Sequence, residues 1–88
     1  MKQYTFHADA SHGWLAVSLN ELIELDVKPS SYSYFDKANE IVYLEEDQDA
    51  GLFIKAYINK YKRQPKINEE YQEQSFVRSL RTMWKPLQ

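Results

Sequence analysis

The residues of this sequence most capable of metal chemistry are His7, Asp9 and His12, which form the pattern His-x-Asp-x-x-His near the N-terminus. Neutral imidazole and carboxylate groups are ligands that zinc and related ions prefer. A small metal-dependent enzyme built on these residues is therefore one alternative function. The pattern lacks a fourth ligand at a recognisable spacing, and histidines in a turn also serve as ordinary solvated residues. We therefore predict no metal site and no cofactor.

A dense acidic run, Glu45, Glu46, Asp47 and Asp49, is the second group with chemical potential. Paired carboxylates can act as general acid and base when their environments separate their pKa values. Here the run lies at a predicted helix start, where capping and the helix dipole already favour acidic residues. We expect Asp47 to be the N-cap and predict no catalytic residue. An alternative is that the run mimics phosphate groups and engages a nucleic-acid-binding partner.

The charges are segregated along the chain, although the net charge is only −2. Residues 1–54 contain three Lys and ten acidic residues, whereas residues 55–88 contain eight Lys and Arg and three Glu. Basic residues interleaved with aromatic rings are typical of proteins that bind single-stranded nucleic acid. This alternative function would use Lys60, Lys62, Arg63, Arg78 and Arg81. The acidic net charge argues against it, so nucleic-acid binding ranks second.

Composition excludes several other classes of function. The chain has no Cys, which removes disulfides and thiolate metal sites, and its two Gly are too few for a phosphate-binding glycine loop. The N-terminal residues contain no apolar run typical of a signal peptide, and no segment approaches the roughly 20 apolar residues that span a bilayer. We therefore expect a cytoplasmic protein that does not associate with membranes.

The elements that position these residues follow a ββα pattern that occurs twice. In the first copy, strands are predicted at Gln3–Ala8 and Trp14–Val17, with Gly13 supplying a positive φ in the turn between them. Ser18 then begins a helix, and Glu21 completes a capping box with it.

The second copy places strands at residues 31–35 and 40–45 and a helix at residues 48–61. Beyond it, Lys66–Gln72 is a candidate fifth strand. Four large apolar residues follow and are expected to pack a C-terminal arm onto the body: Phe76, Val77, Leu80 and Trp84. The predicted fold is a single α+β domain of residues 1–88, with a tandem ββα core at 1–64 and the strand and arm at 65–88.

Alternation along the strands predicts two unlike faces of the sheet. Leu15, Val17, Val42 and Leu44 share a side that suits a core beneath the helices, whereas Trp14, Ile41 and Tyr43 lie on the other side. Either the C-terminal arm covers that aromatic face, or the face is exposed and binds a partner protein or a second copy of the chain. The predicted contact residues are Trp14, Tyr32, Tyr34, Tyr43, Glu45, Glu46, Asp47 and Asp49.

Three strings, HGWLAV at residues 12–17, SYSY at 31–34 and VYLEEDQDA at 42–50, resemble a pattern found in small uncharacterised proteins of bacteriophages and plasmids. The resemblance covers about residues 4–57. It implies an accessory protein of a mobile element that acts on host machinery or host defence, and it supplies no catalytic residues. We therefore predict a non-enzymatic protein that binds a host protein in the bacterial cytoplasm and inhibits a defence or regulatory system.

Overall fold

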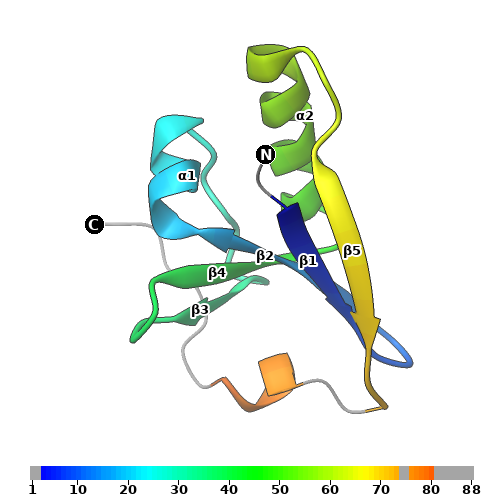
Figure 1. Ribbon diagram of the computed structural model, residues 1–88. Helices are drawn as coiled ribbons and strands as arrows, with labels where there is room; N and C mark the ends of the chain where they lie inside the picture. The colour runs from blue at the N-terminus through cyan, green and yellow to red at the C-terminus, as the bar shows by residue number, and fades with distance from the viewer. Residues whose placement is uncertain (1–2, 74–75, 81–88) are drawn as a thin grey trace.

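The structure, a computed structural model, describes residues 3–73 and 76–80. It contains a mixed five-stranded sheet in the order β3-β4-β2-β1-β5, with both α-helices on one face (Figure 1). The elements are β1 (Gln3–Ala8), β2 (Gly13–Ser18), α1 (Leu19–Glu24), β3 (Tyr34–Asp36), β4 (Ile41–Glu45), α2 (Asp49–Tyr61), β5 (Lys66–Tyr71) and the 3₁₀ helix η1 (Phe76–Ser79). This order confirms the predicted α+β fold, ββαββα with a fifth strand. No helix in residues 3–73 and 76–80 is long and apolar enough to cross a membrane.

The capping box predicted for α1 is present and also ties the helix to the sheet. The Ser18 N–H and hydroxyl donate to Glu21 Oε1 at 3.2 and 2.8 Å, and the Glu21 N–H donates back to Ser18 Oγ. The Tyr4 hydroxyl on β1 donates to Glu21 Oε2 at 2.6 Å. Burial, together with this carboxylate, raises the pKa of Tyr4. One side chain thus caps the helix and anchors it to a strand 17 residues away.

Gly13 is required for a different reason from the predicted one. No glycine among the described residues has a positive φ, and Gly13 is a buried residue of β2. A Cβ at this position would overlap the ring of Phe6 on the neighbouring strand. Close approach of an aromatic ring, rather than an unusual backbone angle, therefore excludes a side chain here.

Substituting the two glycines by Ala should have opposite effects on stability. Gly13→Ala is expected to destabilise the protein by about 1–3 kcal/mol, because the Phe6 ring must move out of a packed site. Gly51 lies in α2, where an added Cβ meets nothing within 4 Å. Gly51→Ala is therefore expected to stabilise by about 0.5–1 kcal/mol through lower chain entropy in the unfolded state. Urea unfolding of both variants measures the difference, and equal midpoints would contradict this explanation.

The second ββα unit begins later than predicted, and its helix starts differently. β3 covers only Tyr34–Asp36, and the side chains of Ser30 and Ser33 before it bind the carboxylate of Asp49 at the start of α2. The N-cap of α2 is Gln48, not Asp47, and it makes no side-chain capping bond. Glu45 instead accepts hydrogen bonds from the N–H groups of Asp47 and Gln48, both at 3.1 Å. The helix ends at Tyr61, and its C-cap residue, Lys62, has a left-handed φ of 60°.

The main core lies between the sheet and the two helices, and it confirms the predicted side of the strands. Its buried members are Tyr4, Leu15, Val17, Leu22, Val42, Leu44, Ala50, Phe53 and Tyr57. Phe53 of α2 is completely buried, and its ring meets that of Tyr4 edge-on at 5.4 Å. Large rings thus supply much of the apolar area that this short chain buries.

On the opposite face of the sheet, η1 covers Trp14 and Tyr43, which is the first of the two alternatives, so these two predicted contact residues are buried. Trp14 and Tyr43 are only 3% and 5% exposed, and they form a second cluster with the fully buried Val77 of η1. In Figure 1, η1 lies on the side of the sheet away from the helices. Phe76 packs its ring on Tyr43 at 5.4 Å. The predicted arm contact of Trp84 lies outside the described residues.

Candidate functional site

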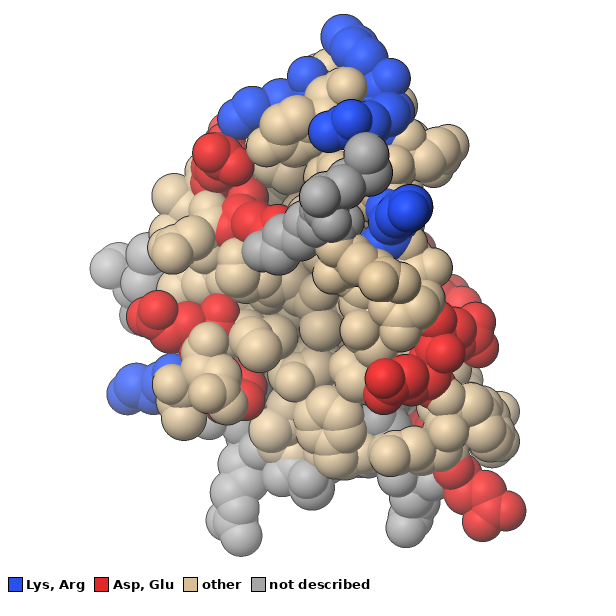
Figure 2. Space-filling view, in the orientation of Figure 1, with Lys and Arg blue, Asp and Glu red and all other residues tan. Residues whose placement is uncertain are grey.

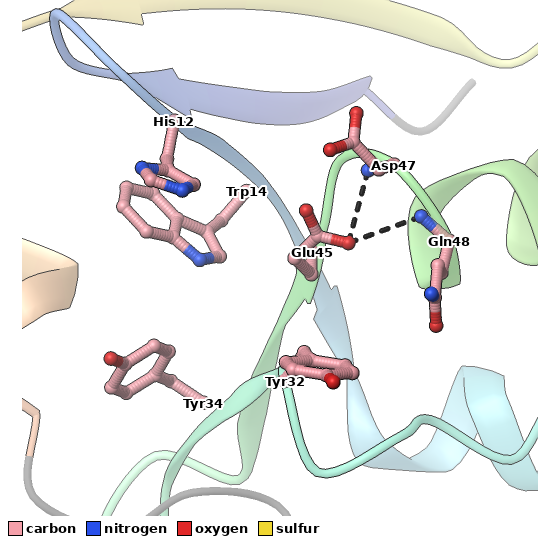
Figure 3. A pocket seen from close by; sticks show the side chains of 7 residues that line it. All are labelled: His12, Trp14, Tyr32, Tyr34, Glu45, Asp47 and Gln48. Atoms are coloured by element: carbon pink, nitrogen blue, oxygen red, sulfur yellow. Dashed lines mark hydrogen bonds between the residues drawn. The ribbon is translucent and has the colours of Figure 1, made fainter.

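A pocket of about 340 Å³ opens where β2 and β4 meet the segment before β3 and the start of α2 (Figure 3). It is lined by His12, Trp14, Tyr32, Tyr34, Glu45, Asp47 and Gln48. Most of these were predicted contact residues, and the structure brings them together from separate segments. His12 and Gln48 were not assigned to this surface. Both could have been predicted to line the pocket, because His12 is close in sequence to Trp14 and Gln48 is next to Asp47.

Aromatic rings form two sides of the pocket. His12 stacks on Trp14 with ring centroids 6.1 Å apart and planes at 22°. Tyr34 meets Trp14 edge-on, at 6.2 Å and 89°. Figure 3 shows the two tyrosines facing the His12–Trp14 pair across the pocket. Tyr32 is 61% exposed, so its ring forms the solvent side of the site. The pocket therefore presents aromatic surface in several orientations.

Carboxylates form a further side. Glu45, at the end of β4, is half-buried, and its Oε1 accepts the N–H groups of Asp47 and Gln48 (Figure 3). Within the described part of the chain, neither Glu45 Oε2 nor the exposed carboxylate of Asp47 accepts a hydrogen bond. The two backbone bonds orient the Glu45 carboxylate. Oxygen atoms of Glu45 and Asp47 can still accept hydrogen bonds from a ligand beside the aromatic rings.

A buried carboxylate behind the pocket holds these walls in place. Asp49 is 1% exposed, and its Oδ2 accepts from the N–H and hydroxyl of Ser30, both at 2.8 Å, and from the hydroxyl of Ser33. The same Ser33 Oγ accepts the N–H of Glu45 at 3.0 Å, and Ser30 Oγ accepts the N–H of Tyr32 at 3.2 Å. Asp49 was predicted to contact a partner. It is instead buried, and it holds pocket residues in position through Ser30 and Ser33.

Two other predicted contact residues also lie outside the pocket. Tyr43 belongs to the buried cluster with Val77. Glu46 is exposed, and its N–H donates to the Gly13 carbonyl at 3.1 Å, but its side chain does not line the pocket. The predicted acidic run is therefore divided: Glu45 and Asp47 face the pocket, Glu46 faces solvent, and Asp49 faces the interior.

The residues of the metal alternative do not form the required site. Asp9 Oδ1 accepts the N–H groups of Ser11 and His12 at 3.0 and 2.8 Å, which explains the carboxylate as part of the turn. His12 stacks on Trp14, whereas the ring of His7 packs against Phe76 at 5.0 Å. In the part of the chain that the structure describes, no three His, Asp or Glu side chains converge on a position for a metal ion.

The basic residues of the nucleic-acid alternative come from separate parts of the chain, and the structure describes only some of them. Lys60, Lys62 and Arg63 are exposed at the C-terminal end of α2, where Figure 2 shows positive charge gathered. Lys60 lies 3.9 Å from a carboxylate oxygen of Glu24 on α1. Arg78 belongs to η1, at the opposite end of the molecule in Figure 1, and Arg81 lies outside the described residues.

His7 should make the stability of this fold depend on pH. Its ring packs against those of Tyr43 and Phe76. Burial lowers the pKa of His7 from 6.5, and this shift is partly offset by Glu70, whose carboxylate lies 4.0 Å away. Because the unfolded chain then binds protons better than the folded one, stability is complete above about pH 6.5 and falls as pH decreases. His7→Gln should lose less stability than the natural protein between pH 7.5 and 5.5. Urea midpoints at both pH values measure this, and equal losses would refute it.

The site combines aromatic faces with oriented carboxylates, an arrangement suited to binding a ligand with apolar and positively charged groups. Comparison with known proteins provides no relative: no family model matches the chain, and no significant match was found among curated proteins or solved structures. The resemblance to bacteriophage and plasmid proteins stays a prediction. The pocket is therefore the main basis for assigning a function.

Proposed function

We propose that this protein is a non-enzymatic binding protein that engages another protein through the pocket between β2, β4 and the start of α2. One observation carries the proposal: Trp14, Tyr32, Tyr34, Glu45 and Asp47 come from separate segments and line a single pocket. Tyrosine and tryptophan are enriched where proteins bind each other, because they supply large contact areas with few rotatable bonds.

The partner that we propose is a host bacterial protein. The resemblance to proteins of bacteriophages and plasmids supports this choice, since accessory proteins of that kind often act on host machinery. By occupying a surface of its partner, the protein would inhibit a defence or regulatory system without chemistry of its own. Tyr32 is the residue best placed to make first contact, because its side chain is the most exposed of the tyrosine and tryptophan side chains lining the pocket.

Affinity capture from nuclease-treated bacterial lysate tests the proposal, with the tagged natural protein compared with two variants. Tyr32→Ala removes an exposed pocket ring, whereas Tyr71→Ala removes an equally exposed tyrosine on β5 outside the pocket; their exposed fractions are 61% and 60%. We expect one stoichiometric protein to be retained by the natural protein and Tyr71→Ala, and to be lost with Tyr32→Ala.

Two results would oppose the proposal. Capture that is unaffected by Tyr32→Ala would place the interface elsewhere on the molecule. Capture of nucleic acid alone, or of proteins that disappear on nuclease treatment, would favour the basic end of α2 as the binding surface, and that binding should weaken steeply with added salt.

A further inference from the structure

We propose that the pocket binds the side chain of an arginine presented by a basic segment of the partner. This inference rests on the proposed function and specifies the chemistry that the same pocket recognises. The reasons lie in the kinds of groups that surround the pocket, in how firmly they are held, and in the capacity that they leave for a ligand.

The aromatic walls favour a cation. The face of an aromatic ring carries negative electrostatic potential and attracts a positive group within about 6 Å of its centre. Trp14 and Tyr34 stand perpendicular to each other, and Tyr32 approaches from the solvent side (Figure 3). Because Trp14 is only 3% exposed and Tyr34 already meets it edge-on, a flat cation entering the pocket would stack on the exposed ring of Tyr32.

The carboxylates favour a cation that also donates hydrogen bonds. Glu45 Oε1 is held by two backbone N–H groups, which fixes the direction of the carboxylate before any ligand arrives. Asp47 adds a second negative charge on the same side of the pocket. A ligand therefore meets acceptors whose orientation is already determined, and less conformational entropy is lost on binding.

The rigidity of the pocket comes from the interior of the fold. Asp49 binds Ser30 and Ser33, and these serines accept the N–H groups of Tyr32 and Glu45. The aromatic and the acidic sides of the pocket are thus both attached to one buried carboxylate. Their spacing is set before a partner binds, as a selective site requires.

Arginine fits these groups better than lysine. The guanidinium group is planar, weakly hydrated and rich in donors, so it stacks on rings and bonds carboxylates at the same time. A lysine ammonium is compact and strongly hydrated, and it has no flat face to stack. An acidic segment would be repelled by Glu45 and Asp47, and also by the adjacent Glu46.

Titration of the ¹⁵N-labelled protein with the probe peptide acetyl-Gly-Gly-Arg-Gly-Gly-amide tests the inference. We expect the peptide to shift the Asp47 and Gln48 amide signals, since both N–H groups bond to Glu45. The matched peptide with citrulline keeps the shape of arginine without its charge, and should bind at least about tenfold more weakly. A lysine peptide should also bind more weakly than the arginine peptide.

Equal binding of the arginine and citrulline peptides would overturn the inference. Tighter binding of a trimethyl-lysine peptide would reassign the pocket to quaternary ammonium groups.

Two neighbouring glutamates provide the matched variants. Glu45→Gln keeps the acceptor for both backbone N–H groups but removes the pocket charge, and should weaken the arginine peptide by about fivefold or more. Glu46→Gln removes a charge just outside the pocket and should change the affinity by less than about twofold, as a screened surface charge does. Equal effects would mean that the peptide responds only to general negative charge, which would refute the inference.

The outcome separates this inference from the proposed function. If lysate capture depends on Tyr32 but the arginine peptide does not bind, the pocket is a protein-binding site with a different ligand, and only the inference fails. If capture is independent of Tyr32 and the peptide also fails to bind, both fail.

Discussion

Asp49→Ala is expected to destabilise the protein by about 3–5 kcal/mol, because it removes a buried acceptor of several hydrogen bonds to a charged group, each worth about 1.5–3 kcal/mol. The carboxylate is completely enclosed and accepts three hydrogen bonds from Ser30 and Ser33. Truncation leaves the buried hydroxyl of Ser33 and the half-buried donors of Ser30 without this acceptor, and a buried unsatisfied group costs about 1–3 kcal/mol. Asp49→Asn should destabilise less than Asp49→Ala, because all three bonds go to Oδ2 and an amide oxygen can take its place, although the bonds lose their charge.

Asp47→Ala is the matched control, since it removes the same charge two positions earlier from an exposed side chain. Its effect on stability should stay within about 0.5 kcal/mol. Urea unfolding followed by far-ultraviolet circular dichroism measures both variants. If Asp47→Ala were the more destabilised of the two, Asp47 would be the structural acid of this helix start and the hydrogen-bond network assigned to Asp49 would be wrong.

Trp14→Ala should produce a loss of similar size, about 3–5 kcal/mol, as for other large-to-small substitutions in protein cores. The indole is 3% exposed and packs with His12, Tyr34 and the cluster that contains Val77. Its removal opens a cavity between the sheet and η1, and the surrounding structure can collapse only partly. The pocket would also lose its deepest aromatic wall, so binding and stability should fall together.

Tyr32→Ala distinguishes the loss of binding from the loss of stability. Tyr32 lines the same pocket but is 61% exposed, so its removal should change stability by less than about 0.5 kcal/mol. Thermal unfolding of both variants, followed by circular dichroism, measures the contrast. A cooperative transition of Trp14→Ala at the natural midpoint would show that the indole is a surface residue and that η1 does not cover it.

Local patterns in the sequence were sufficient for most of the fold. The alternation in β2 and β4 correctly placed Leu15 and Val42 beneath the helices and Trp14 on the other face, because neighbouring side chains on a strand always point to opposite sides. The capping box of Ser18 and Glu21 was also predictable, since its partners are only three residues apart. The fifth strand was predictable as an element, but its parallel pairing with β1 was not.

The functional site depended on contacts that no local pattern contains. Asp47 and Asp49 look alike at a helix start, yet only Asp49 turns inward, because Ser30 and Ser33 reach it from 19 and 16 residues away. Likewise, Trp14 and Tyr43 are buried in a cluster with Val77 of η1, which is distant from both of them in the sequence. The sequence by itself therefore determined which residues are aromatic or acidic and which face of a strand each occupies. The tertiary structure decided which of them remain accessible, because accessibility depends on distant segments packing together.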